Sequence, residues 1–253
     1  MSQTLRLPEI LEIARETGKV AVEDLAAHFG VTVQTIRRDL SELAEDGRLD
    51  RVHGGAVLPS GITNLGYEER RLLNQPAKRA MARACAKDIP AGACVFLNIG
   101  TSTEAVAREL LHHSDLMVVT NNMNVASILA PNTNCEIIMA GGVLRRADGG
   151  LVGSLTTRMI TQFKFDYAVI GCSALDQDGD VLDFDFQEVT VSQTIIAQAR
   201  QTFLVADHSK FQRHAPVQIT SLSKLDRFYS DLALDASLAA ACKTWQTEVR
   251  LCT

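Results

Sequence analysis

The segment TVQTIRRDLSELAEDG, residues 32–47, decides how the first part of the chain folds. Its apolar residues recur every three or four positions, so the segment predicts an amphipathic helix. Thr32 can cap the start with its hydroxyl, and Gly47 can end the helix in the left-handed conformation. The apolar face comprises Val33, Ile36, Leu40, Leu43 and Ala44, and the opposite face carries Gln34, Arg37, Arg38 and Ser41. This polar face has the hydrogen-bonding groups needed to bind a partner.

A shorter helix is predicted just before this one, over residues 20–28, with Gly30-Val31 as a tight turn. Two helices joined in this way form a helix-turn-helix, here over about residues 20–39. The second helix of such a pair fits the major groove of DNA, where Arg suits guanine and Gln suits adenine. The alternative interpretation is a solvated face in an ordinary helical lobe.

A hairpin is predicted directly after the second helix. Residues 49–53 alternate like a strand, Gly54-Gly55 forms a two-residue turn, and residues 56–58 return. A hairpin in this position is a wing. The residues expected to contact DNA are therefore Thr32, Gln34, Thr35, Arg37, Arg38, Arg51 and His53.

Charge sets a limit on this hypothesis. The chain has 253 residues and a formal net charge of −5, and residues 1–58 contain seven Lys/Arg against ten Asp/Glu. Phosphate binding depends on the local density of basic residues, which here lies on the second helix and the wing. We expect one copy to bind DNA weakly, so a homo-oligomer, a dimer or a tetramer, would supply the affinity.

Other classes of protein are disfavoured by composition. No apolar run reaches membrane-spanning length and the start lacks a signal-peptide pattern, so we expect a cytoplasmic protein without a membrane partner. The six cysteines form no CxxC pair and no Cys/His cluster, which predicts neither a metal site nor a disulfide framework.

The rest of the chain predicts a larger α/β domain. Residues 59–74 are expected to be a linker, with a helix over 67–88 broken near Pro76 whose basic residues, Arg70, Arg71, Lys78 and Arg83, are interpreted as solvated. Strands are expected at 94–97, 117–120, 136–139, 167–171, 202–205 and near 227–229. Their alternation with helices predicts a largely parallel, Rossmann-like sheet over residues 75–253, which binds ligands at the carboxyl ends of its strands.

The turn after the first of these strands has the composition of a phosphate site. Gly100, Thr101, Ser102 and Thr103 offer backbone N–H groups, hydroxyls and the positive end of a helix dipole. A strand-to-helix turn that binds nothing would use similar residues. Neither GxxxxGK[ST] nor GxGxxG occurs in the chain, so no nucleotide cofactor is expected.

Further polar turns should reach the same sheet edge. They supply Asn121, Gly141, Gly142, Arg145, Asp183, Asp185, Asp207 and Lys210. Carboxylates can bind polyol hydroxyls, and Lys210 can pair with a charged group. Two alternatives are open. In the first, Asp183 and Asp185 cap the helix that starts near Glu188, and in the second, Asp207 and Lys210 form a buried structural pair.

Two stretches of the chain resemble one known family. The run Val31 to Leu40, followed by His53-Gly54-Gly55-Ala56, resembles the amino-terminal domain of the DeoR family of bacterial transcriptional regulators. The later segments resemble the carboxy-terminal effector domain of that family, which is similar in fold to ribose-5-phosphate isomerase. The resemblance implies a winged helix-turn-helix domain over residues 3–58 and a sugar-phosphate-sensing domain over residues 75–253.

The effector domain resembles the isomerases in its binding segments but departs from them in its acid–base residues. The Gly100–Thr103 loop looks like their phosphate loop, and Asp207-x-Ser209-Lys210 looks like their Asp-x-Ser-Lys segment. Where they have an Asp-Gly-Ala-Asp stretch, this chain has Gly171-Cys172-Ser173-Ala174, which lacks carboxylates for proton transfer. The resemblance therefore implies a sensor without catalytic residues. The rival is an isomerase-like enzyme with an appended DNA-binding domain.

Finer features narrow the implied effector. Residues 118–126, 183–186 and 207–211 are similar to those of family members that control glycerol 3-phosphate utilisation. The resemblance implies a repressor of a carbon-catabolism operon that sn-glycerol 3-phosphate, or another phosphorylated polyol or sugar, releases from double-stranded operator DNA. An activator built from the same parts cannot be separated from a repressor by sequence.

Overall fold

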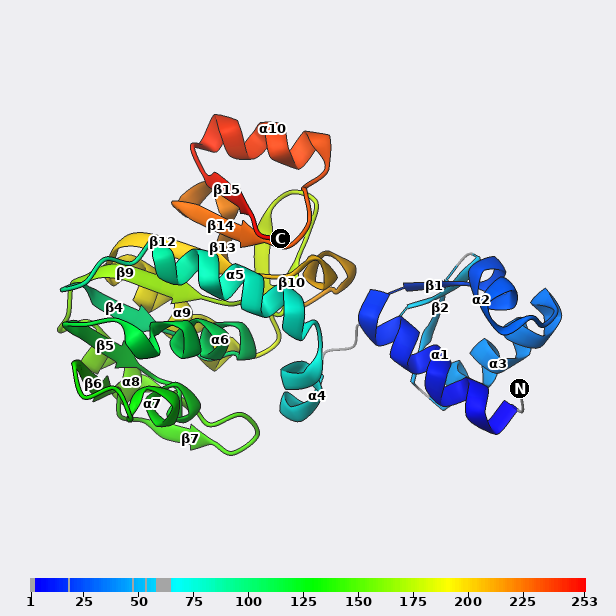
Figure 1. The fold of residues 1–253 in the computed structure, drawn as a ribbon, viewed down its shortest axis with the longest axis horizontal. Helices are drawn as coiled ribbons and strands as arrows, with labels where there is room; N and C mark the ends of the chain where they lie inside the picture. The colour runs from blue at the N-terminus through cyan, green and yellow to red at the C-terminus, as the bar shows by residue number, and fades with distance from the viewer. Residues whose placement is uncertain (1–2, 18, 47, 53, 58–64) are drawn as a thin grey trace.

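The computed structural model describes residues 3–17, 19–46, 48–52, 54–57 and 65–253 (Figure 1). Residues 3–57 have a hydrophobic cluster of their own, which includes Ile10, Leu25 and Leu40. The cores of the remaining residues form two further clusters. Among the described residues, no helix is both long and apolar enough to cross a membrane.

The first part of the chain contains three helices and a small antiparallel sheet. Its elements are α1 (Gln3–Thr17), β1 (Lys19–Ala21), α2 (Val22–Phe29), α3 (Val33–Glu45), β2 (Asp50–Val52) and β3 (Gly55–Val57). The sheet order is β1-β3-β2, so β2 and β3 form the predicted wing and β1 extends it. The helix-turn-helix and wing predicted from the sequence are confirmed.

Three local predictions in this part were wrong. Val20 lies in β1, where it pairs with Ala56, because it completes the wing sheet instead of starting α2. Gly55 lies in β3, where a Cβ would come within 1.9 Å of the Val20 carbonyl oxygen, so this close approach requires glycine. Val33 is 37% exposed, since it lies in the first turn of α3 outside the core. The predicted roles of Gly47 and His53 fall outside the described residues.

The ends of α2 and α3 follow from their capping residues. Gly30 ends α2 in the left-handed conformation, with φ 62°. Thr32 starts α3 by accepting a hydrogen bond from the Thr35 backbone N–H at 3.2 Å, as predicted.

The second part begins with α4 (Tyr67–Leu72) and α5 (Gln75–Lys87). The predicted break in this helical segment is confirmed and lies at Leu73-Asn74, where Asn74 has a φ of 50°. Pro76 lies in the first turn of α5, where its missing N–H costs no hydrogen bond.

A seven-stranded parallel sheet follows, as the sequence predicts. Its order is β15-β14-β12-β9-β4-β5-β6, and every neighbouring pair is parallel. The strands are β4 (Cys94–Leu97), β5 (Leu116–Thr120), β6 (Cys135–Met139), β9 (Phe165–Ile170), β12 (Ala199–Val205), β14 (Arg227–Ser230) and β15 (Glu248–Leu251). The prediction omitted β15.

Helices cover both faces of this sheet (Figure 1). Besides α5, they are α6 (Thr101–Glu109), α7 (Met123–Leu129), α8 (Ser154–Ile160), α9 (Phe186–Gln198) and α10 (Ala236–Trp245). Alternate residues of β4 pack on opposite sides: Val95 joins the cluster with α5 and α6, and Phe96 joins the cluster with α8 and α9. This burial on both faces explains why the strands are almost wholly apolar.

Smaller strands form two additions to the sheet. A hairpin consists of β7 (Val143–Arg145) and β8 (Gly150–Val152). An antiparallel sheet consists of β10 (Ala174–Leu175), β11 (Asp180–Asp183) and β13 (Val217–Ser221). Both additions follow the carboxyl end of a sheet strand in the chain, and both bring charged side chains toward the cavity described below.

Candidate nucleic-acid interface and anion cavity

The outer face of α3 is free to meet a partner within the described structure. Ile36, Leu40 and Leu43 are fully buried, which fixes the orientation of the helix. Gln34, Arg37 and Arg38 are consequently exposed. Thr35 is half-buried, with its hydroxyl 2.9 Å from that of Thr32.

A buried ion pair holds α3 against α1. The Arg6 guanidinium donates to both carboxylate oxygens of Asp39, at 2.5 and 3.1 Å, and Asp39 is 1% exposed. This hydrogen bonding raises the pKa of Arg6. The sequence prediction missed the pair, although Asp39 follows Ile36 by three residues and therefore lies on the buried side of the helix.

The wing places one more arginine beside α3. Arg51 is exposed and donates from Nη1 to the backbone carbonyl of Arg37 at 3.4 Å. The predicted contacts from Thr32 to Arg38 therefore lie on one helix, with Arg51 next to it. The geometry can present guanidinium and amide groups to a duplex, while the assignment of individual contacts stays a prediction.

A small cavity of about 20 Å³ lies where β4 and β9 end. Its lining includes five of the predicted residues, Gly100, Thr101, Ser102, Asp183 and Lys210, together with Arg70, Ile99, Gly171, Cys172, Ser173 and Glu188. This space suits about one water molecule. A larger ligand can enter only if lining side chains move.

The start of α6 forms one wall of the cavity. Gly100 has a φ of 138°, which favours glycine, and the helix begins at the next residue. Thr103 is fully buried and donates to the Asn98 carbonyl at 2.6 Å, so it supports the loop instead of facing the cavity. The Thr101 hydroxyl donates to the Arg70 carbonyl at 3.3 Å.

Two buried lysines supply positive charge at this wall. Lys210 lines the cavity, and its ammonium makes no hydrogen bond or ion pair to any described residue. Burial, and then the charge of Arg213, lowers the pKa of Lys210 to about 8. Lys78 donates to the Arg70 carbonyl, and burial lowers its pKa to about 7.

The burial of Lys78 corrects the interpretation of the 67–88 segment as solvated. Lys78 is 5% exposed, because it shares the inner face of α5 with Met81 and Cys85. Arg70 is half-buried and lies 3.6 Å from an Asp148 carboxylate oxygen. The spacing of Lys78 to Met81 and Cys85, three and seven residues, is the signal that could have found it.

Asp207 supports the lysine wall from behind. It is buried, accepts from Asn74 Nδ2 at 2.8 Å and from the Ser209 hydroxyl, and caps the short helix His208–Gln212 that carries Lys210. Burial opposes ionisation, but the charge of Lys210 and these hydrogen bonds lower the pKa of Asp207 to about 2. The structure thus gives Asp207 a structural role and leaves Lys210 on the cavity.

Carboxylates form another wall. Asp183 is buried and accepts from the Ser173 hydroxyl at 2.9 Å and from the Phe184 backbone N–H at 2.6 Å. Glu188, which the prediction missed, accepts from Arg145 Nη2 at 2.5 Å through Oε2. Burial, and then the charge of Asp183, raises the pKa of Glu188.

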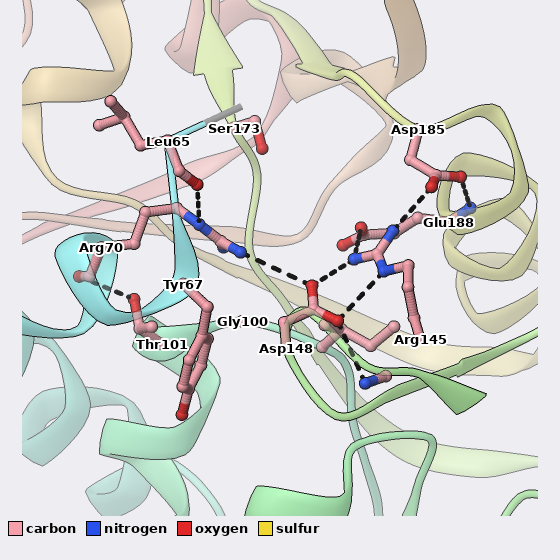
Figure 2. A network of polar contacts seen from close by, with 12 residues as sticks. Leu65, Tyr67, Arg70, Gly100, Thr101, Arg145, Asp148, Ser173, Asp185 and Glu188 are labelled. Carbon is pink, nitrogen blue, oxygen red and sulfur yellow. Dashed lines mark hydrogen bonds and ion pairs between the residues drawn. The ribbon is translucent and has the colours of Figure 1, made fainter. Parts of the chain in front are cut away.

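Arg145 joins three acidic residues beside the cavity (Figure 2). It pairs with Asp148, with Asp185 at 2.9 Å and with Glu188, while Asp148 also lies near Arg70. Asp185 caps α9, which is the alternative that the sequence left open, and neither it nor Arg145 lines the cavity.

The remaining residues predicted to bind the effector, Asn121, Gly141 and Gly142, make structural contacts near the sheet edge. Asn121 is buried and donates to the Leu151 carbonyl at 3.1 Å. The Gly141 carbonyl accepts from the Thr156 hydroxyl, and a Cβ on Gly142 would come within 2.1 Å of that hydroxyl. None of the three belongs to the cavity lining. The structure therefore does not bring them together with Lys210.

Burial also explains the state of Cys172. The thiol lines the cavity, and desolvation raises its pKa to about 12. It is a neutral side chain at physiological pH, unsuited to act as a nucleophile.

Comparisons with known proteins cover both regions. Residues 6–61 match the DeoR-like helix-turn-helix domain, and residues 73–232 match the DeoR C terminal sensor domain. The chain is 43% identical over 252 residues, with full coverage of both chains, to the glycerol-3-phosphate regulon repressor of Escherichia coli (strain K12). It is 45% identical to the repressor of the same name from Haemophilus influenzae, over 91% of this chain and 90% of that one.

A solved structure is similar to this chain at a much lower sequence identity. Ribose 5 phosphate isomerase A from Neisseria gonorrhoeae aligns with 53% of this chain and 52% of its own, at 10% identity and a TM-score of 0.40. This likeness carries no inference about the cavity. The two family matches are informative, because the first contains α3 and the second contains the cavity walls from Gly100 to Lys210.

Proposed function

This chain belongs to the DeoR family of transcriptional regulators, and we propose that it is a repressor whose hold on operator DNA is released by sn-glycerol 3-phosphate. In this proposal residues 3–58 bind DNA, residues 59–74 connect the two parts and residues 75–253 sense the effector. The two relatives described above are named as repressors of the glycerol 3-phosphate regulon, which supports this choice of effector.

The DNA side of the proposal rests on α3 and the wing. Gln34, Arg37 and Arg38 are exposed on a helix whose other face is fixed in a core, and Arg51 lies beside them. Such side chains can make bidentate hydrogen bonds to base edges and ion pairs to phosphates.

The effector side rests on one observation above the others. Lys210 is a buried residue whose ammonium makes no hydrogen bond or ion pair to any described residue, and it lies on a cavity with the amino end of α6. A phosphate group would satisfy both features. The carboxylates of Asp183 and Glu188 line the same cavity and can accept hydrogen bonds from polyol hydroxyls.

The small volume of the cavity supports a link between binding and movement. Thr101 and Lys78, two donors suited to phosphate, both donate to the Arg70 carbonyl in α4. An entering phosphate would compete with that carbonyl. Since α4 is the first described helix after the connecting residues, its release would alter how the two parts are joined. Such coupling is typically worth ~1–3 kcal/mol.

Two substitutions separate the two activities. Arg38→Ala should weaken operator binding by ~1–3 kcal/mol if Arg38 contacts a base, with effector affinity unchanged. Lys210→Ala should leave operator binding intact and abolish its release by sn-glycerol 3-phosphate. Fluorescence anisotropy with labelled promoter fragments measures operator binding and its release, and isothermal titration calorimetry measures the affinity for the effector.

Arg158→Ala is the matched control, since Arg158 is an exposed arginine on α8 outside both regions. It should behave like the wild type in both assays. Normal calorimetric affinity of Lys210→Ala for the effector would refute the cavity as its site. Unchanged operator affinity of Arg38→Ala would remove Arg38 from the interface.

A further inference from the structure

Glu188 presents an unused acceptor at the cavity. Its Oε2 accepts from Arg145, whereas its Oε1 makes no hydrogen bond to any described residue. We infer that Glu188 selects effectors by the end remote from the phosphate, because Oε1 accepts a hydroxyl and the carboxylate repels a second anionic group. This inference rests on the proposed effector site and specifies which ligands it admits.

The position of Glu188 is set by the N-terminal cap of α9. Asp185 accepts hydrogen bonds from the backbone N–H groups of Gln187 at 2.8 Å and Glu188 at 3.0 Å. Glu188 therefore lies in the first turn of α9, and 13% of its side chain is exposed. The cap fixes the position from which its carboxylate reaches the cavity.

Arg145 acts as a positioning residue for this carboxylate. Its guanidinium pairs with Glu188, Asp185 and Asp148 at once (Figure 2). Arg145 is not one of the residues that line the cavity. Arg145, together with Arg70, which lies 3.6 Å from Asp148, thus supplies two positive charges to three carboxylates. The carboxylate wall, to which Asp183 also belongs, keeps an excess of negative charge.

The charges of the cavity walls then discriminate between ligands of equal length. One wall has Lys210 and the amino end of α6, and it suits a phosphate. The other has Asp183 and Glu188, so a ligand carboxylate there would meet like charges with little water to screen them. A ligand hydroxyl would instead donate a charge-assisted hydrogen bond to Glu188.

Calorimetry of the full chain with two three-carbon phosphates tests this inference at a pH above 8, where Glu188, whose pKa burial raises to about 8, is ionised. sn-Glycerol 3-phosphate ends in a hydroxyl, and 3-phosphoglycerate ends in a carboxylate. We expect the wild type to bind the first about tenfold more tightly or better. The affinity ratio is the affinity for sn-glycerol 3-phosphate divided by the affinity for 3-phosphoglycerate. Glu188→Gln removes the charge but keeps the shape and an acceptor, so this affinity ratio should fall at least about fivefold.

Glu136→Gln is the matched control, because it makes the same change of charge at an exposed carboxylate on β6 that does not line the cavity. Its affinity ratio should match that of the wild type. Arg145→Gln should lower the ratio, since Glu188 would lose its orienting partner. General structural damage would weaken both ligands alike and leave the ratio unchanged.

The outcomes separate the inference from the proposed function. Wild-type protein that binds both compounds equally, or an unchanged ratio in Glu188→Gln, would overturn the inference alone. Wild-type protein that binds neither would contradict the proposed effector site and the inference with it. If Glu188→Gln fails to fold, Glu188→Asp keeps the charge, and it should still exclude 3-phosphoglycerate while binding sn-glycerol 3-phosphate more weakly.

Discussion

Lys78 and Lys210 should make effector binding depend on pH. Burial lowers their pKa values to about 7 and about 8, so part of their charge is lost near neutrality. A bound phosphate favours the charged forms and raises both pKa values again. Affinity should therefore be greatest near pH 7 and fall as the pH rises to 9. Ionisation of Glu188, whose pKa is raised, adds negative charge and acts in the same direction.

Calorimetry in two buffers with different ionisation enthalpies would measure the proton uptake that accompanies binding. Lys210→Arg provides the control, because arginine stays charged throughout this range and should flatten the pH profile. Affinity that rises between pH 7 and 9, or binding that releases protons at pH 8, would contradict this account of the two lysines.

The element that transmits the signal is expected to be α4. Its Arg70 carbonyl accepts from Thr101 and Lys78, and its Tyr67 hydroxyl donates to Glu104 of α6 at 3.0 Å. Because an effector phosphate would take the first two donors, binding should increase hydrogen exchange at the α4 amides. Mass spectrometry of peptides covering residues 67–73 measures this change, and we expect no increase over the helix α10.

The variant Tyr67→Phe tests separately whether the contacts of α4 limit its hydrogen exchange. The variant lacks the hydroxyl that donates to Glu104 and accepts from Asn124 Nδ2 at 3.0 Å. Exchange in α4 should then be faster even without effector. Glu68→Gln is the control, since Glu68 is exposed and pairs with Arg71 at the surface. Stronger protection of α4 upon effector binding would show that α4 is not released.

Elements with a local pattern could be predicted from the sequence. The 3.6-residue period of α3, its Thr32 cap and the apolar runs of β4 and β5 depend on neighbouring residues alone. β1 and β15 were missed because each is defined by its partner: Lys19–Ala21 is a strand only where it meets β3, and Glu248–Leu251 has mostly exposed side chains at the sheet edge. Pairing between distant segments leaves little trace in such short sequences.

The cavity was predictable only in part, for the same reason. Gly100, Thr101 and Lys210 belong to turns whose composition indicates an anion site. Glu188 lines the cavity from the first turn of α9, and Lys78, which is outside the lining, donates to the Arg70 carbonyl from the inner face of α5. Charged residues of helices are normally solvated, so the sequence does not indicate either placement. Only the packing of α5 and α9 against the sheet reveals that these two charges are buried beside the predicted turns.

At the scale of the whole molecule, charge argues for assembly. The chain has a net charge of −5, and residues 1–58 are themselves acidic overall, so long-range attraction to DNA is weak. Local arginines on α3 and the wing must then act together from more than one copy. We propose that a homo-oligomer, a dimer or a tetramer, binds repeated operator half-sites, because linked sites gain affinity through effective concentration.

If operator and effector favour different arrangements of the same molecule, their binding must be reciprocal. A given reduction in operator affinity at saturating sn-glycerol 3-phosphate requires an equal reduction in effector affinity when operator is saturating. For a coupling of ~1–3 kcal/mol, both factors lie between about 5 and 150. Anisotropy gives the first factor, and calorimetry with a promoter fragment gives the second. Two different factors, obtained with the same buffer and subunit concentration, would mean that the oligomer changes, and factors that keep growing with ligand concentration would mean that the effector displaces DNA directly. In that case α4 would not be the connection between the cavity and α3.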